Sequence, residues 1–421
     1  MLDIKFIKDK FNSVIESVTK RNVKADPKLV IELYDRRNAI QQRLDEIRNK
    51  KNDNANKMKG KRSKEERDIL IEEGKEFKTK ITVLEIEERE LDIQYKNEAM
   101  KLPNLIDETV PAGGEADSIE LYKVGKIREF DFTPKDHYEL GVNLNILDFE
   151  SATSVSGQKF YYLKNEGALL ELALINYAMN KLWKKGFTPY ITPDLAKTSI
   201  IEGLGFNPRG NETNIYSIKD SDLCLIGTAE ITIGGLNHNK ILLEDELPLK
   251  IAGFSHCFRT EAGAAGLSTK GLYRVHQFSK VEMFIICHPN ESKDFLENLR
   301  DIEEEIFKEL GIPYRVLNIA AGDLGNPAYK KYDLEAWMPG RGSYGEVTST
   351  SNCTDYQSRR LNIRYKDNNG KNQFVHMLNG TAIAVPRAII SILENFQNKD
   401  GSVDIPKVLV PFTGFEKIGK N

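Results

Sequence analysis

The sequence has few cysteines, and their spacing matches neither metal ligands nor disulfide partners. Cys224, Cys257, Cys287 and Cys353 lie far apart in the 421 residues, and no two of them form a C-x-x-C pair. The pattern therefore indicates neither a disulfide framework nor a cysteine-rich zinc site. The six histidines are scattered, so no zinc is expected. Cysteine use of this kind favours a reducing compartment.

Long apolar runs are also missing. The first ten residues, MLDIKFIKDK, alternate charged and apolar side chains, and the apolar stretch 168–183 contains Glu171 and Lys181. A signal peptide or a membrane span needs an uninterrupted apolar segment. We therefore expect a cytoplasmic protein that does not span a membrane.

Three common catalytic motifs are absent as well. The sequence contains no H-E-x-x-H and no G-x-S-x-G, and the Gly-rich stretch 263–270 lacks the G-K-[ST] ending of a phosphate loop. A Walker A nucleotide site is thereby excluded. The 60 basic and 63 acidic residues give a net charge of -3, so a nucleic-acid partner would have to bind a local basic cluster.

Residues 28–101 have the composition of long helices. They contain no proline and only two glycines, Gly60 and Gly74. Two apolar heptad series run through them: Leu33, Ile40, Leu44, Ile47 and Met58, then Leu70, Phe77, Ile81, Leu84, Leu91, Tyr95 and Leu102. Gly60 can end one helix, and Ser63 with Glu66 forms a capping box for the next. The pattern predicts an antiparallel two-helix coiled coil about 50 Å long.

The predicted turn of this hairpin is strongly basic. Its cationic residues are Lys50, Lys51, Lys57, Lys59, Lys61, Arg62 and Lys64. Only Asp53 opposes them before Glu65. Clustered cations suit a polyanion, because their binding to phosphates releases counterions. A solvated helix end explains the same charges, and charge alone favours that simpler interpretation.

Residues 102–118 form the expected domain boundary, since Pro103, Pro111 and the pair Gly113-Gly114 interrupt helical structure. Beyond them, apolar runs predict strands at 251–258, 281–287, 314–319, 332–338 and 374–378, and helices at 167–185, 291–310 and 386–395. Strands outnumber the helices between them. We therefore predict an antiparallel α+β sheet in preference to a doubly wound one.

Residues 254–283 read as a strand, a long Gly/Ala loop and a returning strand. At period two, the first strand presents Arg259 and Glu261 on one face, and the second presents Lys280 and Glu282. A guanidinium can bond phosphate with two hydrogen bonds, and small loop residues allow close approach, so this segment suits a phosphate-bearing ligand. A surface ladder of cross-strand ion pairs would give the same pattern.

This segment resembles motif 2 of the class II aminoacyl-tRNA synthetases. Its form F-R-x-E-A-G-x-x-G…H-Q-F-x-K-V-E, over residues 258–282, is similar to the bacterial-type seryl-tRNA synthetases. Residues 186–193 resemble motif 1, and residues 378–395 resemble motif 3. Two further signatures point to the seryl family: G-T-A-E at 227–230, and Y-D-L-E-A-W at 332–337 followed by the run 346–360.

The resemblance covers nearly the whole chain and implies its architecture. The expected fold class is α+β, with an N-terminal antiparallel two-helix coiled-coil arm and a class II catalytic domain on a mixed, mainly antiparallel β-sheet flanked by helices. Residues 1–110 would form the tRNA-binding arm, with the coiled coil at about 28–101, and residues 111–421 the catalytic domain. The resemblance also implies a homodimer.

It further implies a ligase that activates L-serine with ATP and Mg²⁺ and transfers serine to tRNA(Ser), an expectation extended to tRNA(Sec). Arg259 and Arg387 are the implied catalytic residues, on the α- and γ-phosphates of ATP respectively. The implied serine-binding residues are Thr228, Ala229, Glu230, Glu282 and Thr381. The implied ATP-binding residues are Arg259, Thr260, Glu261, Val275, Glu346, Val347, Thr348, Ser349 and Arg387. Glu346 and Ser349 are the implied Mg²⁺ ligands.

The sequence departs from the family pattern at Thr381-Ala382, at Thr348 and at Pro386, although Pro386 can still begin a helix. Two other functions remain open. One is a non-catalytic homologue that acts as an RNA-binding or regulatory module, which the retained charged motif residues disfavour. The other is an enzyme that charges a carrier protein, which the arm disfavours.

Overall fold

The computed structural model describes residues 2–207, 214–261 and 270–419. The chain forms two compact units, Met1–Leu105 and Ile106–Asn421. Four helices make up the first unit: α1 (Ile4–Asp9), α2 (Phe11–Lys20), α3 (Pro27–Lys57) and α4 (Lys64–Lys101). Within the described residues, no helix is both long enough and apolar enough to cross a membrane.

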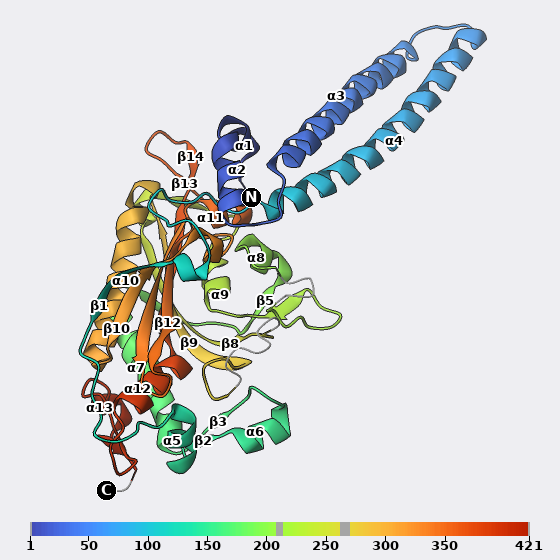
Figure 1. The fold of residues 1–421 in the computed structure, drawn as a ribbon. Helices are drawn as coiled ribbons and strands as arrows, with labels where there is room; N and C mark the ends of the chain where they lie inside the picture. Colours follow the sequence, from blue (N-terminus) through green and yellow to red (C-terminus); the bar gives the residue numbers. More distant parts are fainter. Residues whose placement is uncertain (1, 208–213, 262–269, 420–421) are drawn as a thin grey trace. The chain divides into compact units, whose positions relative to one another are not determined.

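Helices α3 and α4 form the predicted antiparallel hairpin (Figure 1). Helix α3 starts at Pro27 and is capped by the Asp26 carboxylate, and it ends at Lys57, just before Gly60. The capping box at the start of α4 is confirmed: the Glu66 N–H donates to Ser63 Oγ at 3.2 Å, and the Ser63 N–H donates to Glu66 Oε2 at 2.9 Å. These local signals set where the chain reverses.

The two helices contact each other along the predicted apolar stripes. Leu33, Ile40 and Leu44 on α3 and Leu91 and Tyr95 on α4 are buried. The stripe residues nearer the turn are only half-buried: Ile47, Met58, Leu70, Phe77, Ile81 and Leu84. A helix with a single partner covers one narrow face, so the rest of each helix stays in water. Cross-helix ion pairs, such as Arg48–Glu85 at 2.8 Å, flank the stripe.

The second unit is built on an eight-stranded sheet. Its strands are β1 (Ile119–Val124), β4 (Thr188–Ile191), β8 (Leu249–Phe258), β9 (Gln277–Cys287), β10 (Tyr314–Asn318), β11 (Lys330–Met338), β12 (Ser343–Asn352) and β15 (His376–Ala384), in the order β1-β10-β11-β12-β15-β9-β8-β4. Neighbours pair antiparallel except β4 and β8, which are parallel. The predicted α+β class with a mixed, mainly antiparallel sheet is confirmed.

The three predicted helices are also present, as α7 (Glu166–Lys184), α10 (Ser292–Leu310) and α12 (Val385–Asn395). The shorter helices are α5 (His137–Asn143), α6 (Phe149–Ser156), α8 (Thr198–Gly203), α9 (Glu230–Gly234), α11 (Tyr356–Leu361) and α13 (Val410–Thr413). The minor strands are β2 (Leu147–Asp148), β3 (Tyr162–Leu163), β5 (Leu195–Lys197), β6 (Leu223–Leu225), β7 (Ile241–Leu243), β13 (Arg364–Lys366), β14 (Asn372–Phe374), β16 (Val403–Asp404) and β17 (Lys417–Ile418).

One predicted strand is divided in the structure. Residues 374–378 were expected as one strand, but Phe374 ends β14 and His376 begins β15. The intervening Val375 carbonyl accepts a hydrogen bond from Ser358 Oγ at 2.7 Å. This hydrogen bond from α11 occupies a backbone carbonyl that would otherwise be available to pair with a neighbouring strand if the strand were continuous.

Two apolar cores lie on the sheet. The larger contains residues of α7, α10 and α12 together with Val281, Met283 and Ile285 of β9. The smaller contains residues of α8 and α9 together with Phe284 and Ile286, the alternate residues of the same strand. Because side chains alternate along a strand, the two cores lie on opposite faces of the sheet. Lys280 and Glu282 of β9 share the face of the smaller core, as the alternation in the sequence predicts.

Candidate functional site

Three polar side chains of the central strands form the base of the site. Glu282 on β9 pairs in register with Thr381 on β15, and its Oε2 accepts a hydrogen bond from Thr381 Oγ1 at 3.2 Å. Lys280 Nζ lies 2.6 Å from the same oxygen. All three residues are buried. A buried charge is tolerated when it is paired and hydrogen-bonded, and each of these charges has such partners.

A second carboxylate, Glu230, lies at the start of α9. Its N–H donates to Thr228 Oγ1 at 3.2 Å, and its Oε1 accepts from Gln357 Nε2 at 2.8 Å and from Asn379 Nδ2 at 3.0 Å. Burial, together with the Glu282 carboxylate, raises the pKa of Glu230 to about 7. Glu230 therefore changes charge near neutral pH.

Close packing holds α9 against the sheet. A Cβ built on Gly253 of β8 would lie 3.2 Å from the Ala229 Cβ and 2.9 Å from Ile233. Because residue 253 is a glycine, Ala229 can pack directly against β8. The Thr228–Glu230 segment therefore lies next to the strand pair β8–β9, in which Gly253 pairs with Glu282. Ala229 itself is completely buried.

These residues line a cavity of about 360 Å³. Its lining includes Thr228, Glu230, Arg259, Lys280, Glu282, Lys331, Glu346, Ser349, Asn379 and Thr381. Three carboxylates, Glu230, Glu282 and Glu346, lie with hydroxyl and cationic groups in the lining of this cavity. Such a set matches a small ligand that carries an ammonium, a hydroxyl and a carboxylate.

Arg259 follows β8 directly and lines both this cavity and a second one. Its Nε donates to the Gly227 carbonyl at 3.3 Å, and its guanidinium lies 5.3 Å from the centre of the Phe278 ring. Nearby, the Thr260 N–H donates to the Asn214 carbonyl at 3.2 Å. Glu261 lies 3.4 Å from Arg274. Residues 262–269, which continue motif 2, lie outside the described residues.

The second cavity contains the other predicted arginine. Arg387 lies in the first turn of α12, whose first turn also holds Pro386, so the predicted helix start is present despite the departure from the family pattern. Its Nη1 lies 3.1 Å from Glu346 Oε1 and also donates to the Glu346 carbonyl at 3.0 Å. The Arg387 guanidinium lies 4.7 Å from the centre of the Tyr273 ring.

Most of the predicted ATP-binding residues lie around this second cavity, but Ser349 lines only the 360 Å³ cavity and Thr260 lines neither. The lining of the second cavity includes Arg259, Glu261, Tyr273, Arg274, Val275, Phe278, Glu346, Val347, Thr348 and Arg387. Val275, Val347 and Thr348 are all buried. The Thr348 hydroxyl is already used, because it donates to Glu303 Oε2 on α10 at 3.0 Å. Burial raises the pKa of Glu303 well above its usual range.

Glu346 and Ser349, the predicted Mg²⁺ ligands, lie three residues apart on β12, and both line the 360 Å³ cavity. Burial acts to raise the pKa of Glu346, but Arg387, Lys331 and Arg259 together lower it. The carboxylate is therefore ionised, and with a hydroxyl it supplies the hard oxygen atoms that Mg²⁺ prefers. Among the described residues, no group of three or more His, Cys, Asp or Glu side chains is placed to hold a metal ion. The oxygen atoms of Glu346 and Ser349 therefore suit a cation whose other ligands come from a bound phosphate group.

Several site residues were not predicted from the sequence. Asn379 and Gln357 both hold the Glu230 carboxylate, and Tyr273 stacks against Arg387. Lys331 lies 3.1 Å from the Asp333 carboxylate, whose pKa is raised by burial. Asn379, Lys331 and Asp333 are adjacent to or within stretches that the sequence analysis had singled out, so proximity to a motif was the available signal. Gln357 and Tyr273 also lie within such stretches, at 346–360 and 254–283, but their roles depend on contacts with residues far away in the chain.

Family models match most of the chain in two segments. Residues 1–106 match the seryl-tRNA synthetase N-terminal domain, and residues 215–396 match the class II tRNA synthetase core domain for G, H, P, S and T. The chain is 54% identical over 422 aligned positions to the serine–tRNA ligase of Treponema denticola, with 100% of both chains covered. It is 56% identical to that of Borreliella afzelii, with 99% of both chains covered.

The chain belongs to the seryl-tRNA synthetase family. Among solved structures, it resembles the seryl-tRNA synthetase from Pyrococcus horikoshii complexed with ATP, with 41% identity, a TM-score of 0.92 and 100% of both chains covered. The cytoplasmic serine–tRNA ligase from Naegleria fowleri in complex with AMP gives 33% identity and a TM-score of 0.85, with 100% of this chain and 99% of that chain covered. The second unit therefore has the class II synthetase fold, and the helical hairpin is the arm of this family.

Proposed function

We propose that the chain is a serine–tRNA ligase that activates L-serine with ATP and transfers the serine to tRNA(Ser), and that tRNA(Sec) is also a substrate. One observation carries the proposal. In a chain similar from end to end to serine–tRNA ligases, the buried pair Glu230 and Glu282 lies in a cavity whose wall includes Arg259.

In this proposal the smaller ligand is L-serine. Its ammonium lies near Glu230, with Thr228 and Ala229 positioning that carboxylate. Its hydroxyl lies near Glu282 and Thr381, which are 3.2 Å apart. Alanine would leave these buried polar groups without a hydroxyl partner, so the site rejects it strongly. The methyl group of threonine is rejected by the limited space.

ATP occupies the second cavity in this proposal. Arg259 binds the α-phosphate and the serine carboxylate, and Arg387 binds the γ-phosphate. Thr260, Glu261 and Val275 contact the nucleotide, as do Val347 and Thr348. Arg259 is suited to hold two ligands because it lines both cavities. Glu346 and Ser349 would hold Mg²⁺, which supplies charge neutralisation for the phosphates when it is bound with ATP.

The reaction then needs no covalent enzyme intermediate. The serine carboxylate attacks the α-phosphorus of ATP, which gives seryl-adenylate and pyrophosphate. A terminal ribose hydroxyl of tRNA next takes the seryl group and releases AMP. We assign no protein general base, since fixed cations that hold the reactants in line can supply both positioning and charge stabilisation.

The two parts of the chain have separate roles in this proposal. Residues 1–110 form the tRNA-binding arm, and residues 111–421 form the catalytic domain. The basic residues at the turn between α3 and α4 contact tRNA phosphates, which their exposure and charge support. Localisation in the cytoplasm, where tRNA is charged, is part of the same proposal.

A homodimer is also proposed. Strand β4, which lies in the motif 1 region at 186–193, and helix α7, which directly precedes that region, carry exposed apolar side chains. Leu172 and Trp183 on α7 are 63% and 62% exposed, and Ile191 on β4 is 83% exposed. Apolar side chains gathered in this way are typical of a surface that a partner covers. A second copy of this chain is the partner that the family resemblance implies.

The deciding experiment is ATP–pyrophosphate exchange with each amino acid, followed by charging of total tRNA with labelled serine. We expect exchange that depends on serine and transfer of serine to tRNA. Preference for another amino acid would overturn the substrate assignment. Binding of tRNA without exchange would instead support the non-catalytic homologue, and exchange followed by loading of a protein would support the carrier-charging enzyme.

A further inference from the structure

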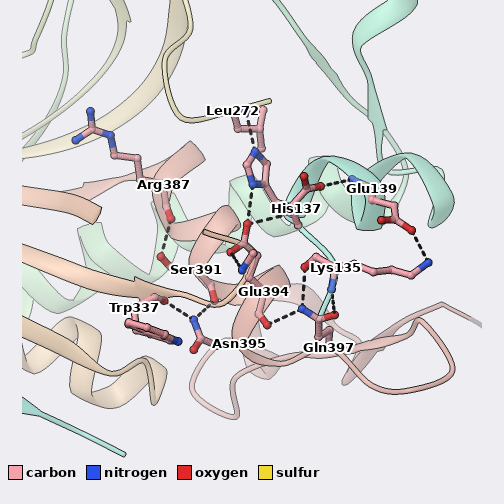
Figure 2. A network of polar contacts seen from close by, with 12 residues as sticks. Lys135, His137, Glu139, Leu272, Trp337, Arg387, Ser391, Glu394, Asn395 and Gln397 are labelled. Atoms are coloured by element: carbon pink, nitrogen blue, oxygen red, sulfur yellow. Dashed lines mark hydrogen bonds and ion pairs between the residues drawn. The ribbon is translucent and has the colours of Figure 1, made fainter. Parts of the chain in front are cut away.

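A network of hydrogen bonds links α5 and α12 to Leu272, in the segment that precedes β9 (Figure 2). Glu394, in the second half of α12, is completely buried. Its Oε1 accepts from the backbone N–H of His137 at 3.0 Å and lies 2.8 Å from His137 Nδ1. Its Oε2 accepts from the N–H of Gly340 at 2.8 Å. One carboxylate thus connects two segments distant in sequence.

The partners of His137 determine how its ring is used. On one side, Nδ1 faces the Glu394 carboxylate, which can only accept. On the other side, Nε2 accepts a hydrogen bond from the backbone N–H of Leu272 at 3.1 Å. The ring therefore carries its proton on Nδ1 and presents an unprotonated Nε2 to Leu272.

Close packing keeps the imidazole against this backbone. A Cβ built on Gly271 would lie 2.1 Å from His137 Nε2, and Gly271 has φ of +84°. Only glycine combines this conformation with such close approach. Close approach also occurs on the other side of Glu394, where a Cβ on Gly340 would lie 3.0 Å from the Glu394 carboxyl carbon.

The segment held by His137 leads directly into the ATP half of the site. Leu272 is buried in the larger core, and the next residue is Tyr273. The Tyr273 ring lies between two guanidinium groups, with Arg341 at 4.4 Å and Arg387 at 4.7 Å from its centre. The N–H of Gly340, which precedes Arg341, is bonded to Glu394 as well. Tyr273, through Leu272 and His137, and Arg341, through Gly340, are therefore both linked to Glu394.

We propose that His137 is a positioning residue for ATP: through its acceptor Nε2 and the Leu272 N–H it fixes the Tyr273 ring against which Arg387 is held. The inference rests on the function proposed above. Among the described residues that line the two cavities, neither His137 nor Glu394 appears, so their effect on the nucleotide passes through Leu272 and Tyr273.

The test is the Michaelis constant for each substrate in serine-dependent ATP–pyrophosphate exchange. His137→Asn keeps an N–H donor near Glu394 but removes the acceptor for Leu272. Leaving that buried N–H unpaired should raise the KM for ATP about tenfold, while the KM for serine stays within about twofold. His137→Gln extends an amide oxygen toward Leu272 and should recover most of the loss. His238→Asn, a change at an exposed histidine outside both cavities, is the matched control.

Equal changes in the two Michaelis constants, or no change in either, would overturn the proposal. A wild-type protein without serine-dependent exchange would instead overturn the proposed function, so the two failures are distinct. A measurement on the wild-type protein tests the same point even where His137→Asn does not fold. Nitrogen-15 shifts of the imidazole should show the proton on Nδ1, and a proton on Nε2 would contradict the proposal.

Discussion

Arg259 stands where the two cavities meet, and its surroundings explain why a guanidinium is needed there. One edge is held by the Gly227 carbonyl, and one face lies over Phe278, which leaves the other nitrogens to bind ligands. A lysine has a single charged atom and could not keep a backbone contact while binding both a phosphate and a carboxylate.

We therefore expect Arg259→Ala to lower serine-dependent pyrophosphate exchange about a thousandfold, because it removes a preorganised group that stabilises developing charge. Arg259→Lys should recover only a small part of this loss. Arg364→Ala, at an arginine that stacks on Phe374 away from both cavities, is the control and should stay near wild type. Near-normal exchange in Arg259→Ala would remove Arg259 from the mechanism.

In the proposed serine site, the raised pKa of Glu230 should make serine binding depend on pH. With a pKa of about 7, this carboxyl is protonated and neutral at lower pH, and it then offers no charge to the serine ammonium. The KM for serine should rise roughly tenfold as the pH falls from about 7.5 to about 6. Glu230→Gln should show a high KM for serine that no longer changes over this range. A variant that kept the wild-type profile would assign the titration to another group, such as Asp333.

The residues of the site could be predicted from the sequence to the extent that they lie in contiguous motifs. Glu230, Glu282 and Thr381 all line one cavity, although they come from three segments far apart in the chain. His137 could not be found in this way. It is a single histidine outside any motif, and its partners Leu272 and Glu394 lie 135 and 257 residues away.

At the scale of elements, the helical hairpin followed from local signals. Pro27 at the start of α3 and the Ser63 capping box at the start of α4 each act on the adjacent helical turn, so the sequence alone could set these helix starts. Strand β12 was not predicted as a strand because its polar run lacks an apolar alternation. Thr348, Thr350 and Ser351 are nevertheless buried there, and only long-range partners such as Glu303 show why.

The turn of the hairpin gives a prediction at this scale. Replacing Lys57, Lys59, Lys61 and Arg62 with glutamine should raise the KM for tRNA about tenfold and make it less sensitive to salt, since fewer counterions are released on binding. Pyrophosphate exchange should not change, because these residues are far along the chain from motifs 1 to 3. The control replaces Lys75 and Lys80, which form ion pairs with Glu72 and Glu76 on α4. Similar effects of both sets on tRNA charging would argue against a specific contact at the turn.

For the whole molecule, the edges of the large sheet are the regions most open to association. Strand β4 forms one edge, and all four of its residues are exposed. The sequence could indicate motif 1 here, but the extent of apolar exposure on α7 and β4 depends on how the chain folds around them. The overall amino-acid composition does not reveal this exposed apolar surface, just as the near-zero net charge does not reveal the basic turn.

Association through this surface is testable by sedimentation. Trp183→Glu combined with Ile191→Glu should convert a dimer into a monomer, because charges would replace apolar side chains in the buried contact. Ile69→Glu changes an apolar residue on α4 that is 60% exposed, and it should leave the mass unchanged. Dimers of the double variant would place the interface elsewhere on the molecule.

The length of the α3–α4 hairpin can change by whole heptads. Its contacts repeat every seven residues, and the caps that reverse the chain are confined to residues near the turn. Removing one heptad from each helix would therefore shorten it by about 10 Å while keeping the apolar stripes in phase and the turn intact. The length of the hairpin can therefore change in steps of seven residues without altering a single residue that lines the two cavities.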